Sequence, residues 1–64
     1  MTRKEKRTIA KKLAALELKL QEPDLTEDEA AAIILEMTTL AMRTANMEEM
    51  DEIDEMVQEI LSKN

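Results

Sequence analysis

The side chains in this sequence with the most capacity for chemistry are the carboxylates crowded into the segment 48–56. Two neighbouring carboxylates can perform acid–base catalysis when a cleft buries them unequally and gives them different proton affinities. A helical chain of 64 residues is too short to enclose such a cleft alone. We therefore expect no enzyme activity from Asp51, Glu52 or their neighbours.

The same carboxylates predict no metal site and no cofactor. A calcium-binding loop places its ligands at alternate positions around a glycine, and the chain has no Gly. It also has no Cys and no His, which excludes the usual zinc ligands, thiol nucleophiles and His-activated serines. The lack of Cys is consistent with a reducing compartment, so we expect a cytoplasmic protein. No apolar run approaches the roughly 20 residues of a membrane-spanning helix, and no membrane partner is expected.

These side chains must be positioned by helices, because Gly is absent, Pro23 is the single proline, and strong helix formers dominate. Each predicted helix start pairs a capping side chain with a glutamate three positions later: Thr2 with Glu5, Thr26 with Glu29, and Asn46 with Glu49. The residue before a proline is driven out of the α region, which ends the first helix near position 21. The predicted helices cover 3–21, 27–45 and 47–62.

Apolar residues recur at helical spacing and give each predicted helix one face for a common core. The three stripes are Ile9, Leu13, Leu16 and Leu20; Ala30, Ile33, Met37, Leu40 and Ala41; and Met50, Ile53, Val57, Ile60 and Leu61. In one unbroken helix the second and third stripes would face nearly opposite directions, so we place a break near Asn46. The sequence predicts a single all-α domain over 1–64, either a small three-helix up-down-up bundle or a helical hairpin that completes its core as a homodimer.

The predicted core is thin, since the chain has no aromatic residue and fills several apolar positions with its six methionines. Folds of this size usually gain stability from a disulfide, a metal or a partner chain, and the first two are excluded here. We therefore expect the protein to form an oligomer or to dock on another protein.

Charge divides the sequence at Pro23. Residues 1–22 hold seven Lys or Arg against three Glu, a net charge of +4, and residues 23–64 hold twelve acids against Arg43 and Lys63, a net charge of −10. In an up-down-up bundle the basic start of the first helix would lie beside the acidic start of the third and match it internally. The alternatives are an external polyanion bound by the basic helix and a basic partner bound by the acidic one.

The acidic segment favours a basic partner, because it repeats like charges at helical spacing and each repulsion costs about 0.2–0.5 kcal/mol. We predict a non-enzymatic adaptor or inhibitor, a small regulatory protein that docks an acidic, Met-containing helical face on a basic or apolar groove of another protein. An acidic face could also imitate the phosphate charge of a nucleic acid. The predicted partner-binding residues are Glu48, Glu49, Asp51, Glu52, Asp54, Glu55, Met42, Met47, Met56 and Leu18.

A second interpretation is a small dimeric DNA-binding regulator that contacts phosphates through its basic first helix. Its candidate residues are Arg3, Lys4, Lys6, Arg7, Lys11 and Lys12. The chain has no aromatic side chain to stack on bases, and its net charge of −6 opposes approach to phosphates, so this interpretation is the less favoured one. A third interpretation is a self-assembling helical module that binds further copies of the same chain.

Overall fold

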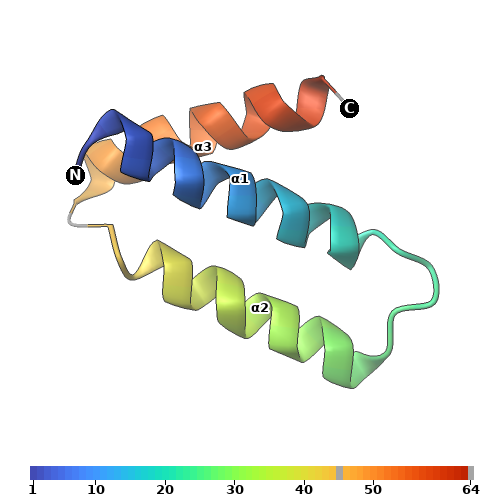
Figure 1. Ribbon diagram of the computed structural model, residues 1–64. Coiled ribbons are helices and arrows are strands. Elements are labelled where there is room, and N and C mark those ends of the chain that lie inside the picture. The colour runs from blue at the N-terminus through green and yellow to red at the C-terminus, as the bar shows by residue number, and fades with distance from the viewer. Residues whose placement is uncertain (45, 64) are drawn as a thin grey trace.

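The structure, a computed structural model, describes residues 1–44 and 46–63. Its elements are three α-helices, α1 (Arg3–Leu20), α2 (Glu27–Ala41) and α3 (Met47–Ser62), and the described residues contain no strand. The all-helical fold class predicted from the sequence is confirmed. Figure 1 shows α1 between α2 and α3, with the N-terminal ends of α1 and α3 at the same end of the molecule.

Each helix begins at the capping residue that the sequence predicts. The Thr2 hydroxyl accepts the Glu5 N–H, and the Glu5 carboxylate accepts the Thr2 N–H in return, which completes a capping box. The Asn46 side chain accepts the Glu49 N–H in the same manner. These bonds satisfy amides that have no partner inside the helix, and such a cap contributes about 1 kcal/mol.

The start of α2 differs in one detail. The Thr26 hydroxyl accepts the Glu29 N–H as predicted, but the Glu29 carboxylate accepts from the Thr26 hydroxyl instead of the Thr26 backbone. The cap is therefore present without the reciprocal bond of the predicted box.

The predicted end of α2 at residue 45 is wrong, because the helix stops at Ala41 and turns through Met42 and Arg43. The Thr44 hydroxyl donates to the Ala41 carbonyl oxygen at 2.6 Å, and the Thr44 N–H donates to the same oxygen at 3.1 Å. Thr44 thus supplies local bonds that compete with continued helix. Position 45 itself lies outside the described residues.

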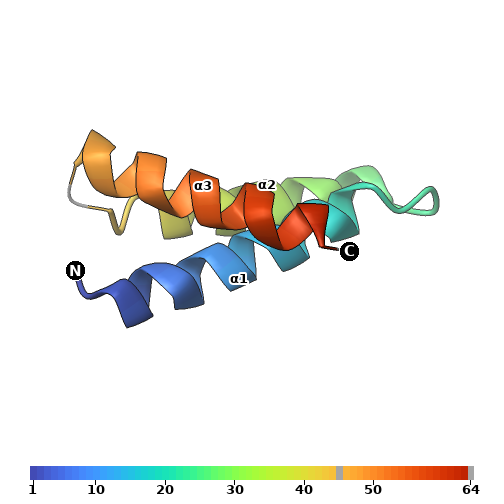
Figure 2. The same ribbon diagram turned by 90° about the horizontal axis from the view of Figure 1, so that it is seen from above.

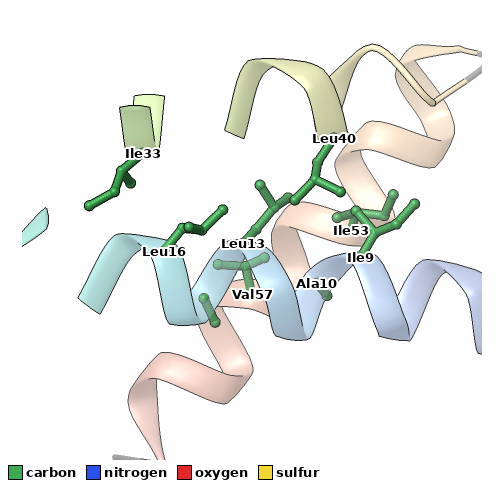
Figure 3. Packing of buried hydrophobic residues seen from close by; sticks show 9 residues of the cluster. Ile9, Ala10, Leu13, Leu16, Ile33, Leu40, Ile53 and Val57 are labelled. Carbon is green, nitrogen blue, oxygen red and sulfur yellow. The ribbon is translucent and has the colours of Figure 1, made fainter. Parts of the chain in front are cut away.

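The buried core lies between α1 and α2 and between α1 and α3. Ile9, Leu13 and Leu16 are buried as the stripe predicts, and Figure 3 shows Leu13 between Leu40 of α2 and Val57 of α3. Met37, Leu20 and Ile60 are only partly buried and pack against this cluster. The predicted stripes therefore identify the core, although its edges are half-exposed.

Two small residues outside the predicted stripes lie where α1 packs on α3. Ala10 and Ala14 are buried one turn apart on α1, on the flank of the leucine stripe, and Ile53 of α3 is fully buried. Small side chains let helix axes approach closely and extend the contact. Accordingly α1 packs more extensively on α3 than on α2, while α2 and α3 touch at few points. The view from above in Figure 2 shows α1 set to one side of both other helices.

Candidate functional site

The acidic segment forms the exposed side of α3, and the helix is positioned by its apolar side. Ile53 and Val57 are buried against the core, and Ile60 and Leu61 are partly buried next to it. Since a helix turns 100° per residue, the carboxylates between these apolar positions point away from the core. Glu48, Asp51 and Glu55 follow one another at spacings of three and four and are all exposed.

Two predicted partner-binding carboxylates instead contact the start of α1. Lys6 Nζ donates to Glu52 Oε2 at 2.5 Å, and Glu49 Oε2 lies 3.7 Å from the amine of Met1. Glu49 Oε2 is fully buried and accepts no hydrogen bond. Part of the acidic segment is thus matched within the molecule, as the internal pairing of the two charge blocks predicts.

Four of the six predicted carboxylates remain on the surface without an ion pair to a described residue: Glu48, Asp51, Asp54 and Glu55. We refer to them as the acidic face of α3. Asp54 also borders the groove in which the three helices meet, opposite Ile34 and Met37 of α2. The face can hold a cationic surface of another molecule, because its charges are displayed on one rigid helix and are not consumed internally.

Among the predicted apolar partner-binding residues, three are exposed and one packs against the core. Met42 and Met47 are 80% and 81% exposed and flank the connection between α2 and α3, and Leu18 is 41% exposed on α1. Met56 is half-buried and packs against the core. Met47 lies one turn before Asp51, so an apolar contact adjoins the acidic face.

The basic residues proposed for phosphate binding lie on two sides of α1. Arg3 and Lys6 share a surface depression with Glu52, Glu55 and Glu59, beside the acids of α3. Arg7 borders the same side of α3. The remaining three, Lys4, Lys11 and Lys12, are exposed and border none of the depressions lined by α3.

The predicted apolar stripes do not include the exposed apolar surface of α2. Ile34 and Leu35 are 54% and 68% exposed, and neither belongs to the stripe from which the core was predicted. Leu35 borders a groove of about 580 Å³ between α1 and α2. Basic side chains line this groove with Leu35, namely Lys12 and Lys19 of α1 and Arg43 of the turn after α2, and the acid beside them is Glu36. The signal was present, because residues 30–42 contain one charged residue, Glu36, and so supply apolar side chains to more than one face.

Within the described part of the chain, no cluster of three or more acidic side chains is arranged to hold a metal ion. None of the described helices has the length and apolar character needed to cross a membrane. Comparisons with models of known protein families, with curated protein sequences and with solved structures find no match for this chain.

Proposed function

We propose that this chain is a non-enzymatic binding protein, an adaptor or inhibitor, that docks the acidic face of α3 on a basic surface of another protein. The observation that carries the proposal is the row of exposed like charges at Glu48, Asp51 and Glu55. Their mutual repulsion destabilises α3, and a cationic partner would convert this cost into attraction. The helices in this proposal form an up-down-up bundle in which α1 and α3 are parallel.

The carboxylates of the acidic face and the neighbouring Met47 have different roles in binding. The carboxylates accelerate the encounter with a positively charged partner and orient it, an effect that salt screens. Met47, at the start of α3, is flexible and polarisable and can fill an irregular apolar contact at the edge of the interface.

The test is a titration of the protein with a fluorescent amphipathic helical peptide made of Leu and Lys, followed by anisotropy. In the test variant three acids of α3 are neutralised: Asp51→Asn, Asp54→Asn and Glu55→Gln. A matched variant loses three charges elsewhere: Glu22→Gln, Asp24→Asn and Glu36→Gln. We expect the α3 variant to bind at least about tenfold more weakly than the matched variant, a difference of about 1.4 kcal/mol.

Equal weakening by both variants would show that net charge alone attracts the peptide, and the proposal would then be wrong. No measurable binding of the wild-type protein at low salt would also refute it.

A second candidate function, phosphate binding by α1, is favoured by one observation. Lys4, Lys11 and Lys12 are exposed and form no ion pair with a described residue. Titration of a short DNA duplex would test it, because three phosphate contacts predict a slope of about −2.7 for log K against log salt. No change in anisotropy at low salt would exclude this function.

A further inference from the structure

The outward side of α2 carries a second apolar stripe. Ile33, Met37 and Leu40 pack toward α1, whereas Ala31, Leu35, Thr38 and Met42 lie on the opposite side at spacings of four, three and four. That spacing is typical of a helix–helix seam. Leu35 and Met42 are largely exposed, and Ile34 adjoins the stripe. Ile34 and Thr38 lie at its inner edge, where they also border the groove that faces α3.

The absence of charge distinguishes this side of α2 from the outward sides of α1 and α3. Charged residues make up 38% of the chain, yet residues 30–42 include Glu36 alone. The outward positions of α1 carry lysines and those of α3 carry carboxylates. A helix that is apolar on opposite sides is typically buried from both, and among the described helices only α1 packs extensively on α2.

We infer that the outward face of α2, formed by Ala31, Ile34, Leu35, Thr38 and Met42, binds the same face of a second copy of this chain, with the two α2 helices antiparallel. Such a contact is isologous, so each residue of the interface is used twice.

The charges at the two ends of α2 are complementary to those of a second α2 that lies antiparallel to it. The first turn of α2 is acidic, with Glu27, Asp28 and Glu29, and Arg43 follows its last turn. Asp28 lies seven residues before Leu35 and Arg43 lies eight residues after it, so each is about 10–12 Å from Leu35 along the helix axis. With Leu35 near the twofold axis, Arg43 of each copy therefore lies beside Asp28 of the other, whereas a parallel pair would align like charges.

The groove between α1 and α2 adds to this complementarity. Lys12 and Arg43 line it next to Leu35, and both are exposed. In the antiparallel pair these cations face the acidic first turn of the neighbouring α2. The acidic face of α3 takes no part in this contact, so the inference does not depend on the proposed function.

The first experiment measures mass by sedimentation equilibrium from low micromolar to millimolar concentration. We expect the wild-type protein to pass from one chain to two. Leu35→Lys should raise the dissociation constant about 30-fold or more, as for a central interface residue, while the helical circular dichroism is retained. Leu18→Lys is the matched control, because it places the same substitution on an exposed leucine of α1 and should leave the dissociation constant unchanged.

The second experiment determines orientation by disulfide cross-linking, since the natural sequence contains no Cys. In the antiparallel pair two Leu35→Cys residues meet at the axis and cross-link. Two Met42→Cys residues, each seven positions from the axis, lie about 20 Å apart and do not. Cross-linking of both variants would indicate a parallel pair and overturn the inference. A wild-type mass of one chain throughout, or a dimer that Leu35→Lys leaves intact, would also overturn it.

Discussion

Replacing Leu13 by alanine tests the packing of α1 most directly. Leu13 is 6% exposed and belongs to the buried cluster that includes Leu40 of α2 and Val57 of α3, between which Figure 3 shows it. Removal of a buried leucine side chain loses its transfer free energy and leaves a cavity, at a cost of about 3 kcal/mol. A domain of this length has a free energy of unfolding of about 3–10 kcal/mol, so the substitution removes a large part of it.

Leu18 provides an internal control, because it is the same residue type on the same helix and its replacement by alanine changes the intrinsic helix propensity by the same small amount. It is 41% exposed and lies on the far side of the α1 stripe. No enclosed cavity forms when its side chain is removed, so we expect Leu18→Ala to cost about 1 kcal/mol or less.

Thermal unfolding of both variants, followed by helical circular dichroism, measures the difference. For a domain of this size 1 kcal/mol shifts the melting temperature by about 4–8 °C. We expect Leu13→Ala to lower it by about 12–24 °C, or to prevent cooperative unfolding, and Leu18→Ala to lower it by less than about 8 °C. Equal losses in the two variants would refute the orientation of α1 described above.

Three further experiments test other contacts. Thr26→Ala removes the cap of α2 and should lower the free energy of unfolding in urea by about 1 kcal/mol. Thr39→Ala, in the exposed middle of the same helix, should change it by less than about 0.5 kcal/mol. The reverse order of the two effects would contradict the observed helix start. A double-mutant cycle of Lys6→Met and Glu52→Gln should give a coupling energy of less than about 1 kcal/mol, because Glu52 is half-exposed. The coupling should disappear in molar salt, and a coupling that survives salt would contradict a solvent-exposed ion pair. Glu55→Gln should stabilise α3 by about 0.2–0.5 kcal/mol through relief of like-charge repulsion, and a loss of stability would imply an internal partner for Glu55.

The helices and the inner face of each were predictable from the sequence, because they follow from local signals. The capping residues Thr2, Thr26 and Asn46 determined where each helix begins, and the stripe containing Leu13 identified the side of α1 that is buried. These features depend on residues within a turn of one another.

The features that were not predictable depend on packing between helices, apart from the end of α2, which depends on local bonds. The burial of Ala10 and Ala14 follows from the side on which α3 approaches α1, which the leucine stripe does not specify. The early end of α2 follows from side-chain bonds of Thr44, a residue that carries no strong stop signal. The division of the acids into paired Glu52 and unpaired Asp51 likewise required the relative position of α1 and α3.

The central position of α1 has a consequence for how the molecule opens. Since α2 and α3 each depend on α1 but scarcely on one another, detachment of α2 breaks one helix–helix interface and leaves the larger one between α1 and α3 intact. Backbone amides of α2 should therefore exchange with solvent through a local opening that costs less than unfolding of the whole chain. We therefore expect α2 to exchange faster than the α1–α3 pair, and a partner bound on α2 to slow that exchange.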